Sequence, residues 1–183
     1  MNLNHVALVL GAVTILASIG LFLQPAATGP LARRFPRWTP VGIALMIVAT
    51  VWFLFNVSQE SVADFANIQR GLLVFFAAVG LGSCIFVQDF LPIRAFACLC
   101  LLAAKVMVDA GRPWLEVTPW VYVIQIWAYV WVILGIWLTV SPWRMRDWIN
   151  CLTSTPGRTR LWGGVQTALG VLVLILGLTV FRK

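Results

Sequence analysis

Charged residues are scarce in this 183-residue chain: they make up 10% of it, whereas 61% of the residues are hydrophobic. A soluble globular domain carries roughly 25% charged residues. A chain with so few polar side chains cannot cover an apolar core with polar surface in water. This shortage of charge excludes an ordinary soluble domain and predicts that lipid is the natural solvent of the chain.

Histidine and acidic residues are also few: His5 is the only histidine, and Asp and Glu together number six. A hydrolase needs a nucleophile and a base within reach of each other, and His5 lies at a terminus. A single histidine also excludes bis-histidine ligation of a haem within one chain. We therefore expect no enzymatic activity and no bound cofactor.

Cysteine is limited to Cys84, Cys98, Cys100 and Cys151. Three of the four lie within apolar segments, where cysteine usually acts as a small hydrophobe. Cys98 and Cys100 are two residues apart, so on a helix they do not share a face. The pattern predicts neither a disulfide framework nor a metal site.

What the chain does contain is six apolar runs, each close to the length of about 20 residues that crosses a bilayer as a helix. They predict an all-α polytopic membrane helix bundle, a single transmembrane domain over residues 1–183. The expected helices are residues 6–23, 40–57, 71–87, 91–109, 120–140 and 161–181. Pro25 and Pro30 are expected to end the first helix and a basic loop, 31–37, to follow it.

The connection around Pro92 allows two interpretations. Residues 88–94 form a tight turn between the third and fourth helices, or those two helices form one long helix that is kinked at Pro92. We prefer the hairpin, because the combined run would far exceed one bilayer crossing.

The basic residues are unevenly distributed between the loops, which predicts an orientation. The first, third and fifth loops hold eight arginines, whereas the opposite side holds Arg70, Arg112 and the terminal pair Arg182-Lys183. Lys and Arg favour the cytoplasmic side of short loops. We therefore expect the arginine-rich loops to be cytoplasmic and both termini to lie outside, with the chain in the cell inner (plasma) membrane. The first run lacks the basic start of a signal peptide and is interpreted as a retained helix.

The fifth loop contains a candidate interfacial helix over residues 142–152. Ser141-Pro142 is a helix-start signal, and the apolar residues that follow fall on one helical face: Met145, Trp148, Ile149 and Leu152. Such a helix lies on a membrane surface with its apolar face at the acyl boundary. We expect Arg144, Arg146 and Trp148 to contact the headgroup region. The alternative is that the apolar face packs against the protein's own helix ends.

Three glycines of the last expected helix, Gly163, Gly170 and Gly177, recur at intervals of seven residues. A stripe of small residues lets another backbone approach closely in lipid. Gly11 in the first helix, together with Thr14 and Ser18, offers a weaker counterpart. The two helices therefore pack together, or the stripe pairs with a second copy or another membrane protein.

The C-terminal part carries a recognisable series of features: Ser141-Pro142-Trp143-Arg144, a short amphipathic link, Arg160 and Gly163, and a helix that closes on Arg182. From Val132 to Arg182 the chain resembles the YjeT-type family of short two-helix bacterial inner-membrane proteins. The resemblance implies a bacterial inner membrane and brings no catalytic residues with it.

Lys105 and Asp109 are the strongest candidates for intramembrane chemistry. They are four residues apart and share a face of the fourth helix, and Gln125 lies at a similar depth in the fifth. Ionisable residues inside a span are costly and often functional. One hypothesis is a proton or ion relay that opens to the outer side. The other is a structural ion pair in which Lys105 extends toward the interface.

The net charge of +7 would suggest nucleic acid in a soluble protein. Here the arginines flank apolar segments, so topology and lipid phosphates explain them, and we expect no nucleic-acid partner. Two function classes remain open: a non-catalytic scaffold or accessory subunit of a membrane assembly, and a small transporter or channel that uses Lys105 and Asp109.

Overall fold

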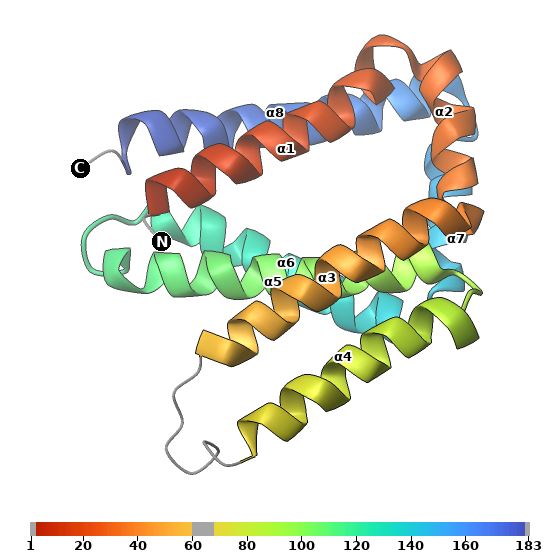
Figure 1. Cartoon of the computed structure of the whole chain (residues 1–183). Coiled ribbons are helices and arrows are strands. Elements are labelled where there is room, and N and C mark those ends of the chain that lie inside the picture. The colour runs from red at the N-terminus through yellow and green to blue at the C-terminus, as the bar shows by residue number, and fades with distance from the viewer. Residues whose placement is uncertain (1–2, 60–67, 182–183) are drawn as a thin grey trace. The chain divides into compact units, whose positions relative to one another are not determined.

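The computed structural model describes residues 3–59 and 68–181, and within these ranges every regular element is a helix (Figure 1). Six helices are long: α1 (Leu3–Leu23), α3 (Thr39–Gln59), α4 (Gln69–Phe86), α5 (Leu91–Gly111), α6 (Val121–Val140) and α8 (Pro156–Thr179). The short elements are α2 (Pro25–Arg34), α7 (Trp143–Leu152) and the 3-10 turns η1 (Phe35–Arg37) and η3 (Arg112–Trp114). The predicted all-α fold is confirmed.

All six long helices have the length and apolar composition needed to cross a membrane, which fits a multi-pass membrane protein. A turn at Gln88–Phe90 separates α4 from α5, so the chain forms a hairpin here rather than one kinked helix. Phe90 adopts a φ of 54°, and its carbonyl accepts the backbone N–H groups of Ile93 and Arg94 at 3.0 and 3.1 Å. Phe90 therefore starts α5 from a left-handed conformation.

Helix α2 replaces part of the expected basic loop. Its first residue, Pro25, suits a first turn, where the missing N–H would be unsatisfied in any case. The hydroxyl of Thr28 donates to the carbonyls of Gly20 and Gln24 at 3.1 and 2.8 Å, which satisfies acceptors at the end of α1. The helix continues through Pro30 and ends at Arg34.

Helix α8 begins at Pro156, five residues before the expected start. Thr155 is its N-cap, and the Thr155 hydroxyl accepts the backbone N–H of Arg158 at 3.4 Å. A capping threonine followed by proline at the first helical position is a strong start signal. It is the same signal as Ser141-Pro142, and it explains the longer helix.

The chain forms two compact units; one boundary falls between α2 and η1, and the other three fall inside α5, α6 and α7. Unit 1 comprises Met1–Arg34, Ala103–Ile133 and Arg146–Lys183, and unit 2 comprises Phe35–Leu102 and Leu134–Met145. The core of unit 1 is one apolar cluster drawn from α1, α5, α6 and α8. Near its end, the ring of Phe181 packs edge-on against Trp114 with centroids 5.8 Å apart.

Within unit 1, α1 and α8 form a close antiparallel pair (Figure 1). A Cβ atom added to Gly11 would lie 2.8 Å from the carbonyl oxygen of Gly170. The hydroxyls of Ser18 and Thr167 are 2.9 Å apart across the pair. Backbones can approach this closely only where side chains are small, so the composition of the two helices determines their contact.

Unit 2 contains η1, α3, α4, the first half of α5, the end of α6 and the first three residues of α7. A Cβ atom on Gly42 of α3 would lie 2.8 Å from the ring of Pro92 in α5. Helices α3 and α4 meet through the rings of Phe53 and Phe76, whose centroids are 4.9 Å apart. Two small clusters of buried residues, one centred on Met46 and one on Leu138, complete this unit.

Candidate functional site

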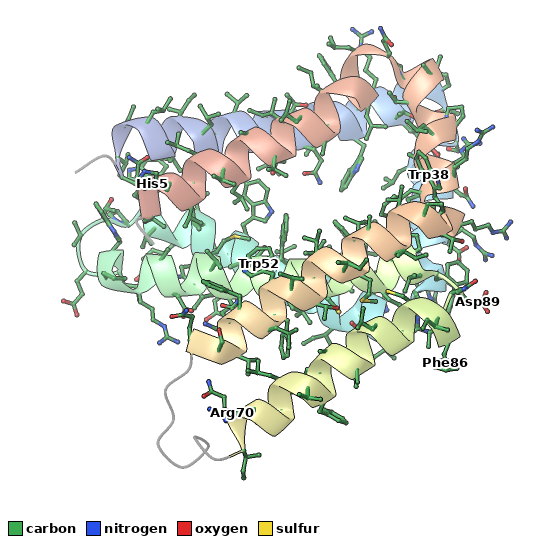
Figure 2. All side chains as sticks on the ribbon, in the orientation of Figure 1. His5, Trp38, Trp52, Arg70, Phe86 and Asp89 are labelled. Atoms are coloured by element: carbon green, nitrogen blue, oxygen red, sulfur yellow. The ribbon has the colours of Figure 1, made fainter. Side chains whose placement is uncertain are left out.

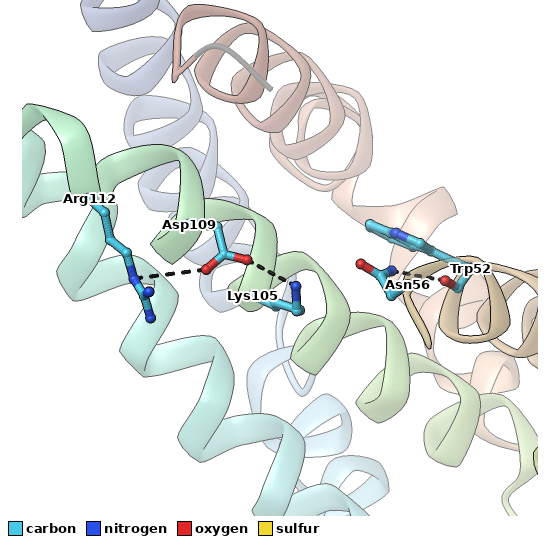
Figure 3. Close-up of polar contacts among 5 residues, drawn as sticks. All are labelled: Trp52, Asn56, Lys105, Asp109 and Arg112. Carbon is cyan, nitrogen blue, oxygen red and sulfur yellow. Dashed lines mark hydrogen bonds and ion pairs between the residues drawn. The ribbon is translucent and has the colours of Figure 1, made fainter. Parts of the chain in front are cut away.

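Lys105, Asp109 and Arg112 form a row of charges along α5 and η3 (Figure 3). The Lys105 ammonium lies 3.0 Å from one carboxylate oxygen of Asp109, and Nε of Arg112 lies 3.9 Å from the other. Their spacing of four and then three residues follows one face of a helix. The structure thus brings together the pair predicted from the sequence and adds Arg112, which the sequence reasoning had assigned only to a loop.

The row is open to its surroundings: the side chains of Lys105 and Asp109 are each 46% exposed, and that of Arg112 is 72% exposed. Lys105 lies six residues before the end of α5, about 9 Å at 1.5 Å per residue. A lysine side chain can extend over such a distance toward an interface. In this arrangement the cationic side chains of Lys105 and Arg112 flank a single carboxylate, that of Asp109.

Gln125 does not join this row in the described contacts. It is buried in unit 1, and its amide donates to the backbone carbonyl of Val108 at 3.4 Å. The same amide packs closely against Gly111, where a Cβ atom would clash with it. Gln125 therefore links α6 to the backbone of α5, a role that satisfies a polar group inside an apolar core.

Helix α1 covers the glycine stripe of α8. Cβ atoms on Gly163 and Gly170 would lie 2.6 Å from the backbone nitrogen of Phe22 and 2.8 Å from the side chain of Ile15, respectively. Gly177 approaches Ala7 in the same way, at 3.1 Å. Of the two arrangements left open by the sequence, this structure contains the one within the chain, and any partner of α8 has to use another face.

The three residues expected at the membrane surface occupy α7. Arg144 is exposed, Trp148 is 39% exposed, and Arg146 pairs with the neighbouring Asp147 at 3.1 Å. Met145, on the expected apolar face, packs against the Leu138 cluster of unit 2. Part of that face therefore contacts the protein's own helix ends. The side chains of Trp148, Arg144 and Arg146 are exposed or partly exposed.

A polar link in unit 1 was not predicted. The guanidinium of Arg33, at the end of α2, donates through Nε to the hydroxyl of Thr153 at 2.8 Å and through Nη2 to the carbonyl of Thr153. The Thr153 hydroxyl in turn donates to the carbonyl of Ile149 in α7. These contacts join α2 to the turn between α7 and α8. The two residues are 120 positions apart, and nothing in the local pattern pairs them.

Helix α4 has no buried residue along its length. One face packs on α3, where Gly80 meets the side chain of Thr50. The opposite face is apolar and includes Phe75, which is 59% exposed, and Ile85, which is 67% exposed. Figure 2 labels Arg70 and Phe86 near the two ends of this helix. A large apolar surface thus lies along one helix.

Small residues also lie on this exposed face of α4, which we call the outward face. Gly71, Ala78 and Gly82 follow one another at spacings of seven and four, which places them on one side of the helix. Among the described residues, a Cβ atom on Gly71 would have no neighbour within 4 Å, and one on Gly82 would meet only the ring of Phe86, one turn along the same helix, at 3.9 Å. Packing within the described part of the chain explains Gly80 but does not explain these two glycines.

Among the described residues, no three His, Cys, Asp or Glu side chains are grouped so that they could hold a metal ion. No family model, curated protein or solved structure matches the chain.

Proposed function

We propose that this chain is a non-catalytic scaffold or accessory subunit of a membrane assembly, and that the outward face of α4 binds a transmembrane helix. The observation that supports this is the unfilled space at Gly71 and Gly82. The proposal includes a bacterial inner membrane, as the YjeT-type resemblance implies, with the arginine-rich loops on the cytoplasmic side.

Glycine inside a helix has a cost in stability. Glycine is about 1 kcal/mol less favourable than alanine at an interior helical position. Most glycines of the spans have a neighbouring element that a side chain would strike: Gly11, Gly42, Gly80, Gly111, Gly135, Gly163, Gly170 and Gly177. Among the described residues Gly82 has no such neighbour, and a helix from outside the chain, packed against this face, would account for a glycine here.

Lipid packed against α4 would not account for the glycine at position 82. Acyl chains cover an apolar helix face whatever the size of its side chains, whereas small residues favour helix–helix contact in lipid. The spacing of Ala78 and Gly82, four residues apart, is the small-xxx-small pattern that permits close helix crossing. The face therefore fits a helix better than it fits lipid.

The second candidate function, a small transporter or channel, is based on the row of charges formed by Lys105, Asp109 and Arg112. Ionisable residues in a span often mark a transport path. Two observations argue against this function. The side chains of Lys105 and Asp109 are each 46% exposed, and the amide of Gln125 already donates to a backbone carbonyl. A relay in a desolvated path would need these groups to be enclosed.

The test is the native mass of the full chain, purified in a mild detergent, with the substitution Gly82→Leu. We expect the unsubstituted chain to form a defined oligomer or to retain a fixed partner, and Gly82→Leu to release it. Gly157→Leu is the matched control, because a Cβ atom at Gly157 also has no neighbour within 4 Å but lies outside this face. A strict monomer that catalyses solute uptake in liposomes would overturn the proposal.

A further inference from the structure

The row of charges is the place where helix α5 becomes accessible from outside (Figure 3). Among the residues of α5, only Lys105 and Asp109 are exposed, and Arg112, which directly follows the helix, is exposed as well. Every other residue of α5 is buried or partly buried. Charged side chains are the most costly ones to expose within a membrane span. The accessible part of this helix is therefore formed by charged groups that can bind a polar ligand.

Asp109 has one carboxylate oxygen that can accept a further hydrogen bond. Its Oδ2 accepts from the ammonium of Lys105 at 3.0 Å. Its Oδ1 lies 3.9 Å from Nε of Arg112, which is too long for a hydrogen bond, and no other described residue donates to it. A carboxylate accepts several donors at once. Lys105 thus fixes the carboxylate, and Oδ1 remains open to a donor from outside the chain.

The guanidinium of Arg112 provides donors beside that acceptor. Its side chain is 72% exposed, and within the described part of the chain its one ionic contact is with Asp109. Neither Nη group donates a hydrogen bond to a described residue. A guanidinium can bind two oxygens of a phosphate through parallel N–H groups. A group that binds anions and a group that binds cations therefore lie side by side, and the distance of 3.9 Å shows that they are neighbours.

This pair of groups lies at the end of membrane spans. Arg112 directly follows α5, and Trp114 packs against Phe181 just beyond the end of α8. Trp120, which is 52% exposed, directly precedes α6. Helices α5, α6 and α8 all have the length and composition of spans, and tryptophan is enriched at the level of lipid headgroups. A ligand with a phosphate at this level is a phospholipid.

We propose that the row of charges holds one phosphatidylethanolamine molecule as a structural lipid, with the lipid phosphate on Arg112 and the lipid ammonium on Oδ1 of Asp109. This headgroup carries both charges on one short chain, so it matches a neighbouring cation and carboxylate. Phosphatidylcholine has the same charges, but its methylated ammonium has no N–H to donate. Phosphatidylglycerol brings no cation to Asp109. The proposal goes beyond the helix-binding function and uses α5 and η3 instead of α4.

The test compares lipids that share their acyl chains and differ in the headgroup. The full chain, freed of lipid in a non-ionic detergent, is titrated with dioleoylphosphatidylethanolamine, its N-methyl and N,N-dimethyl forms, or dioleoylphosphatidylcholine. Bound lipid is counted by native mass spectrometry. We expect phosphatidylethanolamine to bind at least about tenfold more tightly than phosphatidylcholine, because it alone of the two makes a hydrogen bond to the carboxylate. The two intermediate forms keep an N–H and should bind like phosphatidylethanolamine.

Substitutions separate the roles of the two protein groups. Asp109→Asn should remove most of the preference, because it removes the charge that attracts the ammonium, and the lipid-free protein should keep its oligomeric state. Arg112→Gln should weaken the binding of both lipids alike, since both carry the phosphate, whereas Arg112→Lys should retain most of it. The matched control is Asp147→Asn, which removes another exposed carboxylate paired with an arginine and should leave the preference unchanged.

Equal binding of phosphatidylethanolamine and phosphatidylcholine would overturn the proposal, as would an unaltered preference in Asp109→Asn. Tighter binding of dioleoylphosphatidylglycerol would show that the row selects negative charge, and displacement of the lipid by millimolar phosphoethanolamine would show a site for a soluble headgroup; either result contradicts the proposal. If a variant does not fold, the lipid series on the unsubstituted chain still decides. Gly82→Leu should leave lipid binding intact, so failure of one proposal is distinguishable from failure of the other.

Discussion

At the scale of single residues, glycine determines how closely the helices of this chain approach. Where a Cβ atom would meet backbone, as at Gly11, the neighbour cannot rotate away. Where it would meet open space, as at Gly157, an added methyl group costs nothing in packing. The same substitution should therefore have opposite effects at the two positions.

We expect Gly11→Ala to destabilise the protein by up to about 2 kcal/mol. Overpacking costs about 1 to 3 kcal/mol, and the gain of about 1 kcal/mol in helix propensity only partly offsets it. Gly157→Ala should be neutral or stabilising. Thermal unfolding of the purified variants in one detergent measures both. If Gly11→Ala is as stable as Gly157→Ala, the close contact between α1 and α8 is wrong.

The left-handed backbone conformation of Phe90 leads to a second prediction at the scale of single residues. A bulky side chain at a φ of 54° carries a cost of about 1 to 2 kcal/mol, and the Phe90 ring packs against the Leu138 cluster. Both Phe90→Ala and Phe90→Gly lose that packing, but only glycine relieves the backbone cost. We expect Phe90→Gly to be about 1 kcal/mol more stable than Phe90→Ala, in denaturant titrations of the two variants. The reverse order would contradict the left-handed conformation.

At the scale of the element, we interpret the row of charges formed by Lys105, Asp109 and Arg112 as structural, not as part of a transport path. Exposed pairs four residues apart on a helix contribute about 0.3 to 0.5 kcal/mol. We therefore expect Asp109→Asn to change the free energy of unfolding by less than about 1 kcal/mol and to leave the native mass unaltered. A larger loss of stability would place Asp109 in an enclosed site. Loss of a measured solute uptake on the same substitution would favour the transporter.

The elements also show what sequence can and cannot predict. The spans follow from long apolar runs, because the bilayer imposes one length on all of them. Helix α2 was missed because Pro25 and Pro30 are both typical helix breakers. Proline is tolerated in a first turn, where Pro25 lies, whereas Pro30 lies inside the helix. The stripe on α8 predicted close packing, but pattern alone could not choose between α1 and a second copy. Likewise, the contact of Arg33 with Thr153 joins positions too distant for any local pattern to pair.

At the scale of the whole molecule, six membrane crossings would place both termini on the same side of the membrane, and the uneven distribution of arginines between the loops predicts which side that is. The long helices described here number six, and the loops that hold eight arginines alternate with those that hold few. The expected cytoplasmic side is therefore the side of α2 and α7. Cys151, in α7, is an exposed free thiol, whereas Cys100 is buried and Cys84 and Cys98 are partly buried, so a natural reporter lies on that side.

We expect a charged, membrane-impermeant maleimide to label Cys151 in inverted membrane vesicles and not in intact spheroplasts. The reason is the charge bias: moving the arginines of this side across the bilayer would oppose the rule that orients short loops. Cys151→Ser should abolish the labelling, which shows that the thiols of the spans do not react. Labelling of Cys151 in spheroplasts would reverse the topology.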